Sequence, residues 1–231
     1  MPAMAAIGIV AFTTTRGAGS FALGSAEPSD AIWSRWLALA GALSPHAPRL
    51  AFAHQVHGAT VVTHRPGWNG ILRVPDADGH LSLETPTAMA VTLADCVPVF
   101  IGHPSGAASV VHSGWQGTAA RITEKAVHRM SAAGLDPADL VVHCGPSICG
   151  QCYEVGPEVY QKLTGQVTAY ATPVDLRALI AESAQRAGVK EVSVSIACTR
   201  HHNDRFFSHR TGDIGRQLAV IVAHPQVTSP R

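Results

Sequence analysis

Residues Val91–Gly117 read VTLADCVPVFIGHPSGAASVVHSGWQG, and this stretch determines how the rest of the chain is arranged. Short apolar runs alternate in it with turn residues, which predicts strand, turn, strand, turn, strand and then the start of a helix. The first run stops at Ala94-Asp95-Cys96, and the third run ends at His112. Pro98 lies in the second run and predicts an edge strand or a bulge there. The stretch is expected to bring a thiol and an imidazole to neighbouring strand ends.

A metal site needs a further ligand, and the segment upstream offers His54 and His57. In an extended chain these two side chains face opposite ways, because their separation is odd. One of them is therefore expected to join Cys96 and His112. His57 is favoured, because Gly58 beside it lets the backbone come close to another group. One thiol and two imidazoles with an open fourth position suit catalytic zinc, with copper as the alternative.

Composition limits the class of protein. The chain has 231 residues, enough for one large domain with a sizeable core. It is 46% hydrophobic and 14% charged with a formal net charge of +1, which argues against disorder and against a broad nucleic-acid surface. No apolar stretch approaches the roughly 18 residues that span a bilayer. The start of the chain lacks the positive region of a signal peptide, so we expect a first strand at residues 5–13.

The five cysteines are an odd number without a secretion signal, which predicts reduced thiols in the cytoplasm: Cys96, Cys144, Cys149, Cys152 and Cys198. Cys149 and Cys152 form a CxxC pair, which alone is a weak signal. No second CxxC or His pair follows at zinc-finger spacing, and the helix-opening context of a redox motif is missing. We expect no disulfide between them and no part for them in the metal site above. The loop 145–156 is expected to support the pocket through its backbone.

Periodicity and capping residues predict helices at residues 29–43, 118–132, 157–163 and 175–187. Strands are predicted at residues 50–53, 60–63, 139–144, 191–197 and 217–222. Strands and helices are interspersed without the strict alternation of a doubly wound sheet. We therefore expect an α+β fold, a single domain over residues 1–231 in which helices flank mixed β-sheets.

Two further segments each allow two interpretations, one as a ligand-binding loop and one as a plain structural turn. Arg16 lies in a glycine-rich loop, which is either a plain turn or an anion-binding loop with a fixed donor. Asp76 and Asp78 lie in a loop that has too few oxygen ligands for a calcium site, so a polar turn is the simpler interpretation.

Seven segments together resemble, in order, the laccase-domain family: Gln55–Gly58, Asp76–Asp78, Thr92–Pro98, His112–Thr118, Gly145–Ile148, Cys152–Gly156 and Phe206–Arg210. This family was long called multicopper polyphenol oxidases. Members have since been described as purine nucleoside phosphorylases with adenosine deaminase activity, and a bacterial branch as peptidoglycan editing factor. The match covers nearly the whole chain, and the family's metal-binding residues fall on His57, Cys96 and His112.

The resemblance implies a zinc enzyme that takes a small nucleoside and phosphate. Its reactions would be phosphorolysis of adenosine, inosine, guanosine and methylthioadenosine, and hydrolytic loss of the adenine amino group. The expected catalytic residues are Cys96, His112 and Asp95. Expected substrate-binding residues are Arg16, His54, Asp78, Gln116 and Arg210. Gln116 stands where the family usually has Arg, which removes a charge from any anion contact there, and His209 stands where the family usually has Tyr.

Two alternatives differ in chemistry. A copper oxidase acting on phenols needs many histidines in His-x-His pairs, and the sequence contains no such pair, because His201 and His202 are adjacent. A cysteine hydrolase would use Cys96 as nucleophile and His112 as base beside a carboxylate. The peptidoglycan editing role fits either this hydrolase or a zinc hydrolase. Metal content separates the cysteine hydrolase from the zinc phosphorylase.

Overall fold

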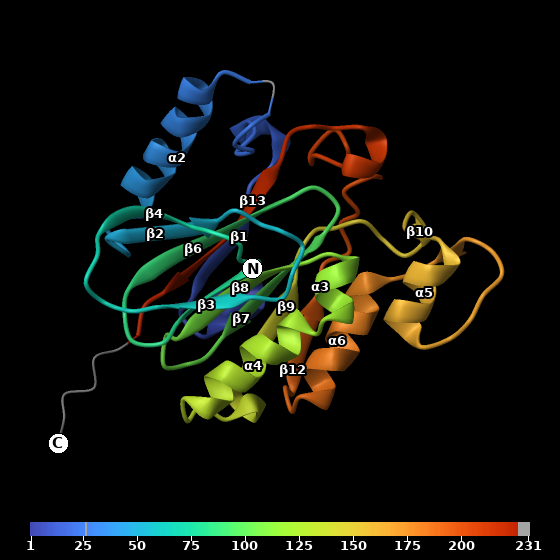
Figure 1. The fold of residues 1–231 in the computed structure, drawn as a ribbon. Helices are drawn as coiled ribbons and strands as arrows, with labels where there is room; N and C mark the ends of the chain where they lie inside the picture. The colour runs from blue at the N-terminus through green and yellow to red at the C-terminus, as the bar shows by residue number, and fades with distance from the viewer. Residues whose placement is uncertain (26, 226–231) are drawn as a thin grey trace.

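Two β-sheets lie face to face and carry helices on their outer faces (Figure 1). The computed structural model describes residues 1–25 and 27–225. Within these ranges the helices are α1 (Pro2–Ala6), α2 (Ser29–Leu43), α3 (Trp115–Ala119), α4 (Ile122–Ala132), α5 (Pro157–Thr164) and α6 (Leu176–Arg186). None of them is long and apolar enough to cross a membrane.

The first sheet has the strand order β1 (Val10–Thr13), β13 (Gln217–Ala223), β6 (Thr87–Leu93), β2 (Arg49–Ala53) and β4 (Gly70–Val74). The second sheet has the order β12 (Glu191–Val194), β9 (Val141–Cys144), β7 (Val97–Gly102), β8 (Ala108–Ser113), β5 (Gly79–Ser82) and β3 (Val61–His64). A separate short pair joins β10 (Glu154–Val155) to β11 (Thr172–Pro173). Both large sheets are mixed, because β2 runs parallel to β4 and β6, β3 to β5, and β9 to β12. The expected α+β fold with mixed sheets is confirmed.

The core consists of three apolar layers between four layers of secondary structure. Between the sheets, side chains of the first sheet such as Met89 and Ile221 pack against Phe100 and Val110 of the second. Helix α2 covers the outer face of the first sheet, where Trp36 stacks on a phenylalanine of β2. Helices α4 and α6 cover the outer face of the second sheet. Alternating side chains of each strand thus face two different apolar layers, which explains why the central strands read as continuous apolar runs.

Pro98 does not mark an edge strand, because β7 lies between β9 and β8. The pairing of β7 with β9 begins at Val99 opposite Cys144, so the missing N–H of Pro98 removes no bond within it. The Pro98 carbonyl still accepts a hydrogen bond from the Gly145 N–H at 2.8 Å. The predicted edge position was wrong, and the proline is accommodated near the start of an interior strand.

Two predicted elements have different bounds in the structure. The helix expected over residues 118–132 is divided into α3 and α4 at Arg121, whose φ of 59° is left-handed and cannot continue an α-helix. The strand expected from residue 5 begins at Val10, because α1 occupies the preceding residues. The sequence PAMAA of α1 has proline in its first turn and three alanines, which favours a helix.

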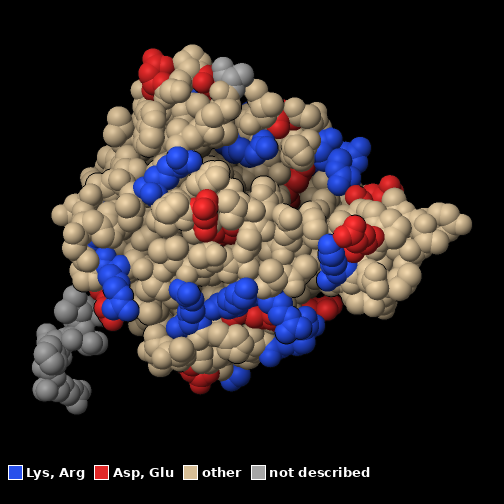
Figure 2. Space-filling view, in the orientation of Figure 1, with Lys and Arg blue, Asp and Glu red and all other residues tan. Residues whose placement is uncertain are grey.

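The charged surface is mixed. On the face shown in Figure 2, several Lys and Arg side chains gather along the lower edge with Asp and Glu among them, and the other charged side chains lie apart. This face presents no continuous basic surface of the kind that binds a nucleic-acid backbone.

Candidate metal centre

Three connections between the sheets meet at one end of the molecule. The chain passes from the first sheet to the second between β2 and β3, between β4 and β5, and between β6 and β7. Since β2 runs parallel to both β4 and β6, all three connections leave the same edge of the first sheet. They contain His57, Asp78 and Cys96 respectively. The hairpin from β7 to β8 then returns His112 to the same edge, because these strands are antiparallel neighbours.

The side chains of His57, Cys96 and His112 converge. One potential ligand atom from each lies within 4.8 Å of the others. The two imidazole rings meet edge to face with 5.0 Å between their centroids. His57 adopts a φ of 60°, a conformation that non-glycine residues rarely take and that is often found at functional sites. The expected convergence of the three residues is therefore found, and their role as ligands stays a prediction.

Asp78 holds both histidines in place. It is fully buried, and its Oδ1 accepts hydrogen bonds from His112 Nδ1 and from the His57 backbone N–H, both at 3.0 Å. Its Oδ2 accepts from the Gly58 N–H at 2.7 Å. Because a carboxylate only accepts, Nδ1 of His112 carries a proton and Nε2 is directed to the thiol. Asp78 was expected to bind substrate, but its burial and these bonds make it a positioning residue.

The thiol of Cys96 and the imidazole of His112 form an ion pair. Burial alone would raise the pKa of Cys96, but His112 and then His57 lower it to about 6. Burial alone would lower the pKa of His112, but the Cys96 thiolate and the Asp78 carboxylate raise it to about 9. Both shifts have the same cause, which is attraction between a thiolate and an imidazolium in a buried site. At neutral pH Cys96 is therefore a thiolate and His112 is an imidazolium.

These residues fit a metal ion. A thiolate and two imidazoles are the donor set of catalytic zinc with three protein ligands, and copper also accepts them. Gly114 leaves the space that the group needs, because a Cβ atom there would lie 2.9 Å from Cys96 Sγ and 3.6 Å from His57 Cδ2. The backbone of Gly114 is in an ordinary conformation, with φ of −79°. Glycine is therefore needed at position 114 because a side chain would crowd the ligand atoms, and not because the backbone adopts an unusual conformation.

A cavity of about 750 Å³ opens beside the three residues. This volume lies in the range of small-molecule sites. Its apolar lining includes Phe21, Leu23, Trp36, Phe52 and Leu93, and its polar lining includes His54, Gln55, Arg73, Thr92, His209 and Arg216. Of the five expected substrate-binding residues, only His54 is in this lining.

Asp95 was expected to be catalytic, but its carboxylate is occupied. Its Oδ1 accepts a hydrogen bond from Thr199 Oγ1 at 2.6 Å, and its Oδ2 accepts from the Arg210 backbone N–H at 2.7 Å. The side chain is buried and does not line the cavity. Its backbone φ of 82° turns the chain sharply just before Cys96. Asp95 is therefore placed as a positioning residue that ties the Cys96 turn to the loop ending at residue 210.

Arg16 also belongs to the framework around the cavity. It donates to the carbonyls of Asn203 and Phe206 and forms a 2.7 Å ion pair with Asp213. The burial of Asp213 works against its ionisation, but Arg16 and the Ser208 N–H lower its pKa to about 2. Arg16 does not line the cavity and fixes the 203–213 loop, and its expected contact with substrate stays a prediction.

Arg210 and Gln116 lie outside the cavity as well. Arg210 donates to the carbonyls of Cys152 and Glu154 and stacks over the Tyr153 ring at 5.2 Å. Gln116 is exposed on α3. Neither residue is among those that line the cavity, so the structure does not bring them together with His54, and their expected substrate contacts stay predictions.

Sequence reasoning missed two arginines that line the cavity. Arg73 lies on β4, a strand that was not predicted, and Arg216 lies just before β13. Arg216 Nη1 donates to the carbonyls of Asp213 and Gly215. Arg73 is exposed at the cavity wall beside His54. The only local signal for this strand is the run Gly-Ile-Leu-Arg-Val at residues 70–74, which is short and does not alternate between apolar and polar residues.

The fold and the site together define a class of protein. Its members are single-domain α+β proteins with two face-to-face sheets, and a His–Cys–His group lies at the end where the chain passes between these sheets. The chain belongs to the family described as multi-copper polyphenol oxidoreductase laccase, whose model matches residues 18–224. It is 36% identical over 203 residues to a purine nucleoside phosphorylase of Streptomyces coelicolor, covering 84% of this chain and 83% of the relative. It is 33% identical over 195 residues to a purine nucleoside phosphorylase of Deinococcus radiodurans, covering 79% and 74%.

Solved structures share the fold. The crystal structure of YlmD from Geobacillus stearothermophilus superposes with a TM-score of 0.87 at 27% identity, over 97% of this chain and 94% of that chain. A hypothetical protein YfiH of Bacillus licheniformis superposes with a TM-score of 0.85 at 23% identity, over 93% and 92%. The structures show a shared fold, and the family model together with the relatives above 30% identity confirms the family resemblance seen in the seven motifs.

Proposed function

We propose that this protein is a zinc-dependent purine nucleoside phosphorylase. The observation that carries the proposal is the convergence of His57, Cys96 and His112 beside a cavity of about 750 Å³. The names of the relatives from Streptomyces coelicolor and Deinococcus radiodurans support the same activity. The proposed substrates are adenosine, inosine, guanosine and methylthioadenosine with phosphate, and the proposed second activity is deamination of adenosine.

The cavity offers separate surfaces to the two substrates. Phe21, Phe52 and Leu93 provide an apolar wall of the kind that a purine ring packs against. Arg73, Arg216 and His54, which also line the cavity, provide cationic and hydrogen-bonding groups for phosphate. In phosphorolysis a phosphate oxygen bonds to ribose C1′ while the bond from C1′ to the base breaks, and the base leaves with a proton.

The metal would be held by His57, Cys96 and His112 and would polarise a substrate oxygen or activate water. Asp78 orients two of these ligands through the hydrogen bonds described above. The chain's own contribution to the reaction is thus to hold substrate, phosphate and ligands in one place and to fix the His112 tautomer.

The test is product analysis of purified protein with adenosine and inosine, each with and without phosphate. We expect phosphate-dependent release of free base, phosphate-independent conversion of adenosine to inosine, and loss of both activities in Cys96→Ala. Release of no purine base from any common nucleoside would reject the phosphorylase function.

Arg73→Gln tests the phosphate contact. We expect the KM for phosphate to rise about tenfold, because a charge-assisted hydrogen bond contributes about 1.5–3 kcal/mol. Arg65→Gln is the matched control, because Arg65 is exposed and does not line the cavity. Gln116→Arg restores the charge usual in the family: the resemblance predicts a lower KM for phosphate, whereas the position of Gln116 outside the cavity lining predicts no change. A change with Gln116→Arg and none with Arg73→Gln would place phosphate elsewhere.

One observation favours a second candidate, a cysteine hydrolase. The lowered pKa of Cys96 and the raised pKa of His112 describe the thiolate–imidazolium state of a nucleophilic cysteine. The editing-factor branch of the family would fit such an enzyme. Chelation separates the two candidates: a metal-free preparation that keeps its activity would support the hydrolase, and one that loses it and regains it with zinc would support the phosphorylase.

A further inference from the structure

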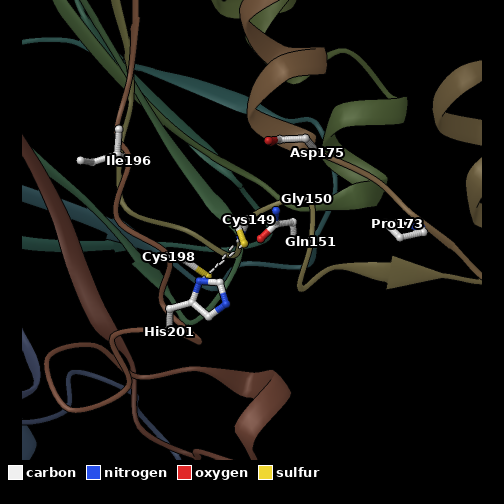
Figure 3. A pocket seen from close by; sticks show the side chains of 8 residues that line it. All are labelled: Cys149, Gly150, Gln151, Pro173, Asp175, Ile196, Cys198 and His201. Atoms are coloured by element: carbon white, nitrogen blue, oxygen red, sulfur yellow. Dashed lines mark hydrogen bonds between the residues drawn. The ribbon is translucent and has the colours of Figure 1, made fainter.

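A second group of ligating side chains lies apart from the first. Cys149, Cys152, Cys198 and His201 each bring one potential ligand atom within 4.8 Å of the others. The Cys152 Sγ lies 3.2 Å from His201 Nε2, and the Cys149 Sγ lies 4.0 Å from His201 Nδ1. Figure 3 shows Cys149, Cys198 and His201 directed toward one another beside an open groove. As expected, the CxxC pair takes no part in the His57 group.

Two short turns of equal spacing build this cluster. Cys149-Gly150-Gln151-Cys152 is closed by a hydrogen bond from the Cys152 N–H to the Cys149 carbonyl at 3.0 Å. Cys198-Thr199-Arg200-His201 supplies the other two ligands at the same spacing. The sequence interpretation of the CxxC missed this second half because it begins 46 residues after Cys152 and ends in a single histidine.

Backbone bonds hold the two turns against each other. Ser147 and Cys198 form a parallel bridge, and the Thr199 N–H donates to the Ser147 carbonyl at 3.1 Å. The Cys149 N–H donates to Cys198 Sγ at 3.3 Å, a contact that stabilises a thiolate. A side chain on Gly150 would meet the Asp175 Cβ at 2.8 Å, so glycine permits the first turn to pack against the start of α6. The ligand geometry is thus fixed by the fold itself.

We propose that Cys149, Cys152, Cys198 and His201 form a structural zinc site. Three thiols and one imidazole complete a tetrahedron without an open position, which is the composition of structural and not catalytic zinc. Cys152 and Cys198 are buried, and all five cysteines of the chain are unbridged in the structure. The first turn does not open a helix, which is the usual setting of a redox CxxC pair. The inference does not depend on the activity proposed for the other site.

The cluster connects with the candidate metal centre through one buried contact. Thr199, inside the second turn, donates to Asp95, the neighbour of Cys96. Arg210, whose N–H donates to the same carboxylate, also donates to the Cys152 carbonyl. A zinc ion at the cluster would therefore fix two loops that support the Cys96 turn, and its loss is expected to lower stability first and activity indirectly.

The zinc content of the purified full-length protein tests the proposal. We expect two zinc ions per chain in the wild type and one in Cys96→Ala, which retains the second site. Cobalt substitution of Cys96→Ala isolates that site and is expected to give the intense thiolate-to-cobalt charge transfer of three thiolates. A disulfide between Cys149 and Cys152 in protein purified without reductant, or a Cys96→Ala protein that binds neither metal, would overturn the proposal.

Two substitutions at His201 separate the loss of a zinc ligand from a general failure of the variant to fold. His201→Ala removes one ligand, and we expect at least tenfold weaker zinc retention against a chelator. His201→Cys supplies a fourth thiolate and is expected to retain zinc, because four cysteines also form structural sites. Equal zinc retention by His201→Ala and the wild type would show that the histidine is not a ligand and would overturn the proposed site. If the first site binds no metal at all, the wild type and Cys96→Ala both carry one ion, which separates the two proposals.

Discussion

At the scale of single residues, Asp78 has the largest influence on the candidate metal centre. It is fully buried and contacts both histidines, yet it is not itself a ligand. Its carboxylate accepts from three consecutive backbone N–H groups as well as from His112. These bonds lower its pKa although its burial acts in the opposite direction. One ionised side chain thus fixes the loop of His57 and the ring of His112 together.

Asp78→Asn is expected to weaken zinc binding about 10- to 100-fold, the usual effect of losing a carboxylate behind a histidine ligand. It should also lower the free energy of unfolding by about 1–3 kcal/mol, because the amide group brings a donor toward backbone donors. Chelator competition and denaturant unfolding measure the two effects. Asp76→Asn is the control, since its carboxylate is 73% exposed and bonds only the exposed His54. Equal losses in both variants would contradict the role of Asp78.

The ligand residues could be predicted from sequence, whereas the residues behind them could not. Cys96 and His112 stand out because each lies at the boundary of an apolar run, and His57 stands out because glycine follows it. Asp78 and Asp95 are acidic residues in turns, and nothing local distinguishes a catalytic carboxylate from one that accepts backbone hydrogen bonds. That distinction depends on burial and partners, which arise only when distant segments meet.

At the scale of elements, the connections between sheets determine the site more than the strands do. Each of the three crossings contains one non-glycine residue with positive φ, namely His57 (60°), Asp76 (43°) and Asp95 (82°). Such conformations are kept only where the surrounding contacts compensate for them. The sequence predicted the strands on either side of two crossings but missed both β4 and β5, so the third crossing, and with it Asp78, had no place in the predicted arrangement.

The 203–213 loop is the other element on which the cavity depends, and Arg16 is its main anchor. Lysine cannot reproduce the planar fork by which Arg16 reaches two carbonyls and Asp213. We expect Arg16→Lys to speed amide hydrogen exchange in residues 203–213 about tenfold, which corresponds to the loss of one charge-assisted hydrogen bond.

Exchange elsewhere, as in β7 and β8, should stay unchanged in Arg16→Lys. Arg65→Lys is the control, because Arg65 is exposed and lies on a different loop. If Arg16→Lys leaves exchange in the loop as it is but raises the KM for nucleoside, Arg16 contacts substrate after all, as the sequence resemblance implied.

At the scale of the whole molecule, the four layers explain both what was predictable and where the site lies. Central strands that face apolar layers on both sides are strongly apolar, so their existence was clear from sequence. Their order was not, because mixed sheets with crossings between them leave no periodic signal. The three candidate ligands lie at the end of the molecule where the chain passes from the first sheet to the second. Loops, and not packed strands, surround them there. A group that titrates there affects metal binding without disturbing the core.

The pH dependence of zinc binding follows from the Cys96–His112 pair. In the metal-free protein the pKa of His112 is about 9 and that of Cys96 about 6. A metal needs neutral His112 and ionised Cys96, so between pH 6 and 9 binding must displace the proton of His112. Zinc affinity should therefore rise at least about tenfold per pH unit in this window, and more steeply below pH 6, where Cys96 is protonated as well.

Zinc affinity measured by chelator competition between pH 5.5 and 8 tests this expectation, with each chelator's own protonation taken into account. Asp78→Asn sharpens the test. Asp78 contributes to the raised pKa of His112, so its loss should move the upper end of the pH-dependent window to lower pH. An affinity that is flat from pH 6 to 8 in the wild type would mean that His112 is already neutral there. The thiolate–imidazolium pair, and with it the cysteine-hydrolase alternative, would then lose its physical basis, while the zinc site itself would stand.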